Sequence, residues 1–446
     1  MGRILSNRSY REKGELSMEL KAWIAVALFA VTILSIARGW MKASTATLLG
    51  ASAMMLFRLV PGSAASQYID SNTVGLLVGM MIVVGILSKT GLFQYIAVKA
   101  IKVTKGNGIL ILLSISLITA VLSAFLDNVT TVLLVSPVVV SLADLIKMNP
   151  MPLLMSEVIA SNIGGTATLI GDPPNMIIGS YAGFSFNDFL LHLSPVVFVI
   201  WVISMVFLCW HYRKDLNPDP AATNRLKEVD ESKLIKDKKL MVWAGFVMFM
   251  VLLGFLFHHH LGLNASVVAL FAAGVLLATS HLDDGEIVHQ EVEWPTIVYF
   301  VSLFILVGGL QENGVILALA DILTDLLSYS PMAMILGILW ISGLSCVFIN
   351  NVAFSAMFVH VVSEMAKSAG MPPDPLFWSL ALGSCLGGNG SYLGAAANAV
   401  MADFAGRSGF HISFGSFFLV GIKTVLISLV VASAFLFVTY RNVVTY

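Results

Sequence analysis

The sequence predicts an all-α polytopic membrane protein made of two inverted-topology repeats of five spans, each with a re-entrant hairpin and a broken helix. Three observations predict it: an apolar composition, a single internal repeat offset and an odd number of crossings per repeat. The 446 residues are 58% hydrophobic and 11% charged, with a mean hydropathy of +0.89. Soluble domains carry about a quarter charged residues, so most of this chain must face lipid or other spans.

The first repeat is expected at residues 18–210, after an N-terminal tail at 1–17. Its parts are scaffold spans at 22–88, a hairpin at 109–146, a broken span at 151–180 and a span at 190–210. The hairpin is expected to be re-entrant, because the polar break at Asp127-Asn128 leaves no room for a loop outside the membrane. Such a turn is tolerated at membrane depth only where protein or water satisfies its backbone.

A linker at 211–240 leads to the second repeat, which has the same order of parts. These are scaffold spans at 241–310, a hairpin at 332–366, a broken span at 376–405 and a span at 413–439, within 241–446. The second hairpin is interrupted by Asn350-Asn351. Both repeats therefore place polar residues where an apolar segment should be continuous.

One offset aligns the two halves without gaps, since Gly308 lies 223 residues after Gly85. The same spacing relates Leu87 to Leu310, Gly91 to Gly314, Asn128 to Asn351, Val129 to Val352, Pro150 to Pro373, Pro152 to Pro375, Gly164 to Gly387, Gly165 to Gly388, Gly171 to Gly394 and Asn175 to Asn398. Glycine and proline matches carry most weight, because these residues fix backbone shape. With five crossings per unit, the second copy must start from the opposite side of the membrane, as in inverted-repeat transporters.

Basic residues set the expected orientation, because lysine and arginine are enriched in cytoplasmic loops. Those of the linker are Arg213, Lys214, Arg225, Lys227, Lys233, Lys236, Lys238 and Lys239. The linker is therefore expected in the cytoplasm, in an inner-membrane protein. Counting back places the basic tail at 1–17 outside, so either this tail is an atypical extension or one span is miscounted.

Four polar clusters lie at equivalent places in the two copies. They read SAFLDNVTT at 123–131, SNIGGTATLIGDPPN at 161–175, CVFINNVAFS at 346–355 and CLGGNGSYLGAAAN at 385–398. Glycines that break a span free backbone groups, whose natural partner at the midplane is a solute, an ion or water. Two hairpin tips facing two unwound spans predict one site on the pseudo-two-fold axis.

The carboxyl groups in these regions are the candidates for proton coupling. Asp127, Asp172 and Glu157 qualify because an ionisable group in a membrane is costly and usually functional. Asp172 has a second interpretation as a helix cap beside Pro173-Pro174. Cys385 is either a thiol contact for a soft solute or an inert buried cysteine. No metal site, cofactor motif or catalytic motif is visible, so no enzyme is expected, and the net charge of −1 gives no reason to expect nucleic acid.

The segments LDNVTTVLL and NIGGTATLIGDPPNMIIG resemble the arsenite permease/sodium–proton antiporter/pink-eyed-dilution-protein group of the ion transporter superfamily. The resemblance covers nearly the whole chain, including the duplication. It implies a homodimer in which a transport domain of hairpins and broken spans moves against a scaffold in an elevator-type cycle. The implied solute- or ion-binding residues are Asp127, Asn128, Thr130, Thr131, Asn162, Gly164, Gly165, Thr166, Asn175, Asn350, Asn351, Gly387, Gly388, Asn389, Ser391 and Asn398.

The second copy departs from the first in charge, since Asn350 replaces Asp127 and Ala395 replaces Asp172. The dicarboxylate branch of the superfamily has Ser-Asn-Thr at its hairpin tips, and an aspartate there would repel an anionic substrate. The expected function is therefore proton-coupled export of neutral arsenite or antimonite. Sodium–proton antiport and a channel of the pink-eyed-dilution type are the alternatives. The implied partners are this small inorganic solute or Na⁺, protons, membrane lipid, a second copy and a soluble arsenic-pump ATPase at the cytoplasmic face.

Overall fold

The computed structural model describes residues 2–219, 230–327 and 330–441, and in these ranges the chain is helical without β-strands. Eight of the described helices are long and apolar enough to cross a membrane. The all-α membrane fold predicted from the sequence is confirmed.

The first repeat contains ten α-helices and one short 3-10 helix within the described residues. They are α1 (Gly2–Ala37), α2 (Ala43–Leu56), η1 (Ala65–Tyr68), α3 (Ser71–Lys89), α4 (Leu92–Val103), α5 (Gly108–Phe125), α6 (Asn128–Leu145), α7 (Met151–Gly165), α8 (Pro173–Ala182), α9 (Phe186–His192) and α10 (Ser194–His211). The first hairpin is α5–α6, and the first broken span is α7–α8.

The second repeat follows η2 (Glu231–Leu234) in the linker. Its helices are α13 (Lys238–Phe257), α14 (Ala265–Thr279), α15 (Asp284–Glu291), α16 (Trp294–Glu312), α17 (Val315–Leu327), α18 (Pro331–Ser345), α19 (Asn351–Ala369), α20 (Asp374–Gly387), η3 (Gly388–Gly390), α21 (Ala396–Arg407) and α22 (Phe414–Tyr440). The second hairpin is α18–α19, and the second broken span is α20–α21.

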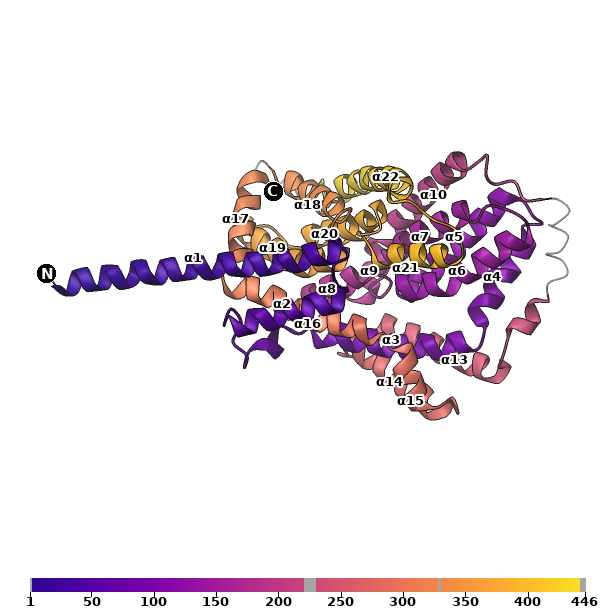
Figure 1. Ribbon diagram of the computed structural model, residues 1–446, viewed down its shortest axis with the longest axis horizontal. Coiled ribbons are helices and arrows are strands. Elements are labelled where there is room, and N and C mark those ends of the chain that lie inside the picture. Colours follow the sequence, from indigo (N-terminus) through magenta and orange to yellow (C-terminus); the bar gives the residue numbers. More distant parts are fainter. Residues whose placement is uncertain (1, 220–229, 328–329, 442–446) are drawn as a thin grey trace.

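Helix packing obeys the repeat offset. The hairpin arm α5 packs on α7, and its counterpart α18 packs on α20; likewise α8 packs on α19, and α21 packs on α6. The scaffold helices pack across the repeats: α2 of the first repeat packs on α16 of the second, and α14 of the second packs on α3 of the first. Figure 1 shows the scaffold helices α2, α3, α13, α14 and α16 along one side, with the hairpins and broken spans along the other.

Two side-chain pairs fix the relative direction of the equivalent helices α3 and α16. Lys89 at the end of α3 contacts Glu291, just before α16 begins, with Nζ 3.2 Å from Oε1. Glu312 at the end of α16 accepts a hydrogen bond from the hydroxyl of Tyr68, just before α3 begins. The two helices therefore run in opposite directions, so the second repeat is inverted relative to the first.

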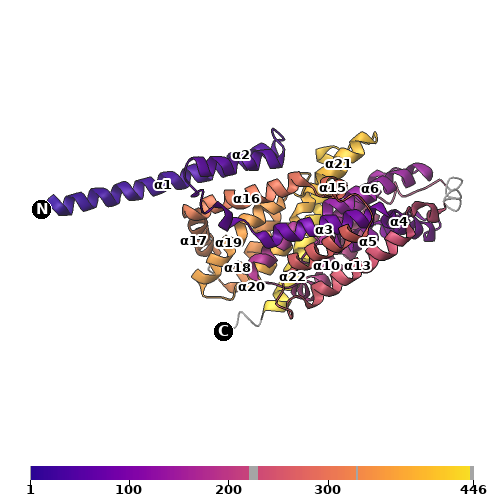
Figure 2. The same ribbon diagram turned by 90° about the horizontal axis from the view of Figure 1, so that it is seen from below.

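The expected tail at 1–17 is not separate from the first span. Helix α1 runs unbroken from Gly2 to Ala37, and Figures 1 and 2 show its first half projecting away from the body of the molecule. Residues 1–37 contain no proline, so nothing in the sequence stops the helix before it enters the apolar segment.

Helices α4 and α17 were not among the expected parts. Each lies between the last scaffold span and the hairpin of its repeat and buries one stripe: Phe93, Ala97 and Ile101 in α4, and Ile316, Ala320 and Leu323 in α17. A search for continuous apolar runs misses such amphipathic helices, because charged residues interrupt them on the exposed face.

Candidate functional site

The two hairpin tips have the same backbone design with different side chains. Asp127 caps α6 by accepting hydrogen bonds from Thr130, 2.9 Å from the amide to Oδ1 and 2.5 Å from the hydroxyl to Oδ2. Asn350 caps α19 through Oδ1, which accepts from the amide of Val352 at 3.1 Å. The hydroxyl of Tyr299 also donates to Asn350 Oδ1, at 3.1 Å. Both tips thus use a short polar side chain to satisfy the first amides of a helix that begins inside the protein.

Each broken span is held open by its own asparagine. Asn175 Nδ2 donates to the carbonyls of Thr166 at 3.1 Å and Thr168 at 2.9 Å. Asn398 Nδ2 donates to the carbonyls of Gly388 and Ser391, each at 2.7 Å. These carbonyls lie where the helix is interrupted, so the two asparagines satisfy groups that would otherwise be buried without partners.

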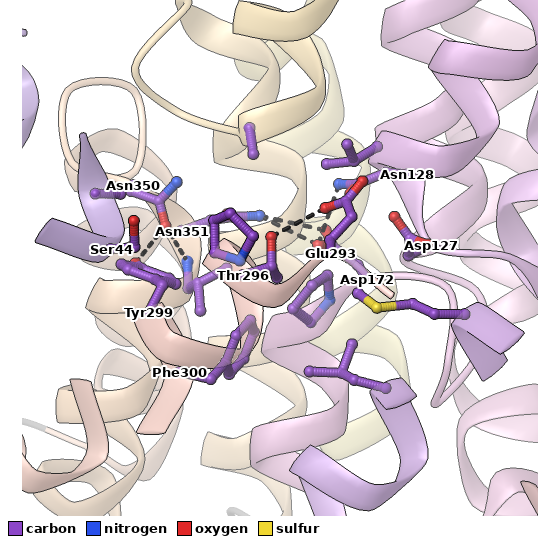
Figure 3. A pocket seen from close by; sticks show the side chains of 18 of the residues that line it. Ser44, Asp127, Asn128, Asp172, Glu293, Thr296, Tyr299, Phe300, Asn350 and Asn351 are labelled. Carbon is purple, nitrogen blue, oxygen red and sulfur yellow. Dashed lines mark hydrogen bonds between the residues drawn. The ribbon is translucent and has the colours of Figure 1, made fainter. Parts of the chain in front are cut away.

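Asp172 lies where the two hairpin tips meet, and its side chain has no exposed surface. Its carboxylate accepts from Asn128 Nδ2 at 3.3 Å and from Asn351 Nδ2 at 3.3 Å (Figure 3). One amide comes from each repeat, and the carboxylate comes from the first only. The carboxylate is therefore stabilised by neutral donors, without a basic side chain beside it.

Asn162 joins the two repeats behind this carboxylate. Its Oδ1 accepts from Asn128 Nδ2 at 3.1 Å. Its Nδ2 donates to Asn389 Oδ1 at 3.1 Å and to Asn398 Oδ1 at 2.8 Å. All four asparagines are buried, so a continuous amide network runs from Asp172 to the second broken span.

A cavity of about 230 Å³ opens in front of Asp172, between the scaffold and the helices of the hairpins and broken spans (α5 to α8 and α18 to α21, called the transport helices below). Five residues predicted from the sequence line it: Asp127, Asn128, Asp172, Asn350 and Asn351. The scaffold contributes polar side chains that the sequence reasoning missed: Ser44, Glu293, Thr296 and Tyr299, which Figure 3 labels, and Lys42. Glu293, which belongs to the second repeat, is the third carboxyl group of the lining, after Asp127 and Asp172 of the first repeat. Asp127 interacts electrostatically with both Asp172 and Glu293.

The cavity is acidic. Lys42 is the one basic side chain in its lining, and it is exposed at the start of α2. Across the described ranges, no three histidine, cysteine, aspartate or glutamate side chains are grouped closely enough to hold a metal ion. The lining therefore offers carboxylate and amide oxygens together with the hydroxyls of Ser44, Thr296 and Tyr299.

The remaining predicted residues lie behind the cavity wall. The hydroxyl of Thr131 donates to the carbonyl of Asp127 at 2.9 Å, and that of Thr166 donates to the carbonyl of Asn162 at 2.8 Å. Ser391 donates to the carbonyl of Val347. These hydroxyls satisfy backbone carbonyl groups, and none of them lines the cavity.

Cys385 and Glu157 are not part of the lining. Cys385 is fully buried; its Sγ lies 3.4 Å from Asn175 Oδ1, and its thiol also interacts with the carboxylate of Asp172. Glu157 is fully buried between α6 and α7, where its Oε1 accepts from the hydroxyl of Ser136 at 2.8 Å. Its Oε2 has no hydrogen-bond partner among the described residues.

Two of the predicted glycines, Gly164 and Gly387, are sites of close helix packing. A Cβ atom on Gly164 would overlap the backbone of Ala120 in α5, and one on Gly387 would overlap the backbone of Gly343 in α18. Ala120 and Gly343 are themselves 223 residues apart. These glycines therefore let each broken span approach its hairpin. Gly165 and Gly388 lie at the break itself, where a Cβ atom on Gly165 would overlap the carbonyl oxygen of Gly171.

The cavity lies toward the side of the membrane that carries the linker. The linker contacts the end of α3, where the amide of Lys236 donates to the carbonyl of Thr90 at 2.9 Å. Helix α16 begins on that same side, as the Lys89–Glu291 contact shows, and Glu293 immediately precedes it. The cavity therefore opens on the linker side of the protein.

Comparisons with known proteins agree with a transporter of this architecture. The chain is 37% identical over 425 residues to a 46 kDa membrane protein of Mycobacterium leprae, covering 94% of this chain and 98% of the relative. It is 37% identical over 423 residues to an uncharacterized transporter of Mycobacterium tuberculosis, with the same shares covered. The P protein of Homo sapiens is 31% identical over 508 residues, covering 95% of this chain and 60% of that protein.

A solved structure and a family model complete the comparison. The YdaH transporter of Alcanivorax borkumensis, described as having an unusual topology, matches with a TM-score of 0.58 at 13% identity, over 95% of this chain and 98% of that one. This likeness concerns the fold. The P protein match confirms the resemblance to the ion transporter superfamily inferred from the two motifs. The family model described as citrate transporter matches residues 26–383, and the chain therefore belongs to the citrate transporter family of membrane transporters.

Proposed function

We propose that this chain is a proton-coupled antiporter of the cytoplasmic membrane that exchanges a small monovalent cation, sodium in the first instance, for protons. The observation that carries the proposal is the environment of Asp172: a fully buried carboxylate at the meeting point of both repeats, held by two amide groups and facing a cavity. Such a carboxylate holds either a proton or a cation, and competition between them couples the two fluxes.

The oxygen atoms around the cavity suit a small hard cation. Carboxylate and amide oxygens are the ligands that such ions prefer. Asp172 and Asp127 supply carboxylates. Within the described part of the chain, the Oδ1 atoms of Asn128 and Asn351 accept no hydrogen bond, so these carbonyl oxygens are available beside Asp172.

An anionic substrate fits less well, although the family carries the name of citrate. Citrate at neutral pH is a multiply charged anion, and three carboxyl groups would repel it. Lys42 alone, exposed at the rim, does not offset them. The cavity therefore supports cation exchange better than it supports tricarboxylate transport.

Export of arsenite or antimonite is the second candidate. The amide groups of Asn128 and Asn351 could hydrogen-bond a neutral trihydroxide, and the two motifs resemble arsenite permeases. This candidate does not rely on a thiol ligand, because Cys385 is absent from the cavity lining and reaches the site only through its interaction with Asp172. A soluble arsenic-pump ATPase at the cytoplasmic face belongs to this candidate only. A homodimer and an elevator-type movement of the transport helices belong to both.

Purified protein in proteoliposomes tests the proposal. With an imposed pH gradient, addition of sodium is expected to collapse the gradient, whereas citrate is not. Asp172→Asn should abolish sodium-driven proton flux, a loss of about 100-fold or more, since charge-assisted interactions are worth about 3 kcal/mol. Asp144→Asn is the matched control, because the Asp144 side chain is 80% exposed and outside the cavity.

Three results would contradict cation exchange. Accumulation of arsenite in everted vesicles without any sodium effect would favour the second candidate. Proton flux driven by citrate would show that this chain transports citrate, the substrate in the family name. Currents too large for a carrier cycle would indicate a channel.

A further inference from the structure

A second cavity of about 460 Å³ lies between the scaffold and the transport helices, on the side away from the linker. Its polar lining residues are Gln67, Tyr68, Asp70, Ser180, Tyr181, Gln311 and His360. Tyr68 in this lining donates a hydrogen bond to Glu312, which marks the end of α16 opposite the linker. The two cavities therefore face opposite sides of the membrane.

The same three helices line both cavities, in the same order along their axes. Helix α16 contributes Thr296 and Phe300 to the first cavity and Phe304 and Gln311 to the second. Phe300 and Phe304 are one turn apart, about 6 Å along the axis. In α19, Asn351 lines the first cavity, whereas Val359 and His360 line the second; in α8, Pro173 and Ser180 divide in the same way.

A buried hydroxyl without a partner lies along α19 between the two groups of lining residues. Ser355 has no exposed surface, and its Oγ has no hydrogen-bond partner within the described ranges. It is one turn after Asn351 and one turn before Val359, so it falls on the same helical stripe as a residue of each cavity. An unsatisfied buried hydroxyl is costly unless a ligand or water reaches it in some state.

The acidic residue of each cavity occupies the same position of the repeat. Asp70 lies 223 residues before Glu293, and each immediately precedes a scaffold helix, α3 or α16. The local geometry is also shared: the hydroxyl of Thr73 donates to Asp70 at 2.5 Å, and that of Thr296 donates to Glu293 at 2.9 Å. No lysine or arginine lines the second cavity.

We propose that the second cavity is the outward-facing half of the cation path, and that Asp70 attracts the cation there as Glu293 does on the linker side. This inference rests on the proposed function and deepens it. When the transport helices move along α16, the Asp172 site passes from the level of Glu293 to the level of the second cavity. The inverted repeats supply one scaffold carboxylate for each side, at the same position of each copy.

Side-specific kinetics test this assignment. In oriented proteoliposomes, Asp70→Asn should raise the sodium concentration for half-maximal exchange from the outer side by roughly tenfold, the ratio expected for about 1.4 kcal/mol of lost binding. The inner value should stay within about twofold. Glu293→Gln should give the reverse pattern. Asparagine caps helices as well as aspartate does, so Asp70→Asn leaves α3 intact.

Accessibility provides a readout that does not depend on the cargo. In a Cys209→Ser background the remaining cysteines, Cys346 and Cys385, are fully buried. Ser180→Cys should react with an impermeant maleimide from the outer side only, and Ser44→Cys from the linker side only. Reaction of Ser180→Cys from the linker side, or from neither side, would overturn the assignment of this cavity.

The outcomes separate the two proposals. Sodium–proton exchange in the unmodified protein, together with unchanged outer kinetics in Asp70→Asn, would refute the role of Asp70 while leaving the proposed function standing. Absence of any sodium–proton exchange in the unmodified protein would refute the proposed function, and the cation role of Asp70 with it.

Discussion

The two repeats have the same backbone at the site and different charges. The hairpin tips, broken spans and close glycine contacts recur at one offset, but Asp127 and Asp172 become Asn350 and Ala395 in the second copy. The second copy instead contributes Tyr299, whose hydroxyl binds Asn350, while the first copy has Leu76 at that position. Both repeats thus share one shape, but among the hairpin and broken-span residues that line the first cavity only those of the first repeat carry carboxyl groups.

The largest effect is expected from breaking the shared shape. Gly164→Val and Gly387→Val should each reduce the yield of monodisperse protein severely, because the new side chain would overlap the backbone of the facing hairpin arm. Overpacking typically costs about 1–3 kcal/mol, and overlap with backbone exceeds what rotamer changes can relieve. Size-exclusion profiles and thermal unfolding in detergent measure this. Gly245→Val is the control, since a Cβ there meets nothing within 4 Å; equal losses in all three variants would show that the close packing is not the cause.

A smaller effect, confined to coupling, is expected from removing the charge difference at the tips. Asp127→Asn keeps the helix cap and should leave the protein folded, while the exchange rate loses its pH dependence and falls by about tenfold. Adding Asn350→Asp to this variant should not restore the exchange rate or its pH dependence. A carboxylate at position 350 would lie against the hydroxyl of Tyr299, and Asp127 has no such tyrosine hydroxyl beside it. Exchange rates measured across a pH series decide the matter. Rescue by the double variant would show that the side of the axis on which the carboxyl lies is irrelevant.

The smallest effect is expected at Glu157, which the sequence marks as a coupling candidate. Glu157→Gln should retain an acceptor for Ser136 and change the exchange rate by no more than about threefold, or roughly 0.7 kcal/mol. The same transport assay measures it. A loss of coupling as large as that of Asp127→Asn would place Glu157 on the proton route even though it lies outside the cavity lining.

The sequence was sufficient for the fold class and the repeat, because the repeat offset constrains many positions at once, but it did not reveal the amphipathic helices α4 and α17. Apolar runs located the spans, and Asp127, Asn128, Asn350 and Asn351 stood out as polar residues within them. The offset also relates Glu293 to Asp70, but neither lies inside an apolar run, so a search limited to interrupted spans passes over both.

Side-chain partners within the site were beyond sequence reasoning. Asn162, Asn175 and Asn398 look like solute ligands in a linear motif. In the folded protein, Asn175 and Asn398 satisfy the carbonyls of the breaks, while Asn162 connects the two repeats. Which atom each amide bonds depends on how two distant segments approach, and the helical patterns do not contain that information.

The packing of scaffold helices across the repeats bears on how the protein is made. Helix α3 receives α14 in a contact so close that a Cβ on Gly79 would lie 2.7 Å from the backbone of Ala269. The ribosome synthesises α3 long before α14. The face of α3 around Gly79 therefore has no packing partner until the second half of the chain is inserted, and the first repeat can complete its fold only then. Separately expressed halves should accordingly be degraded alone and persist together.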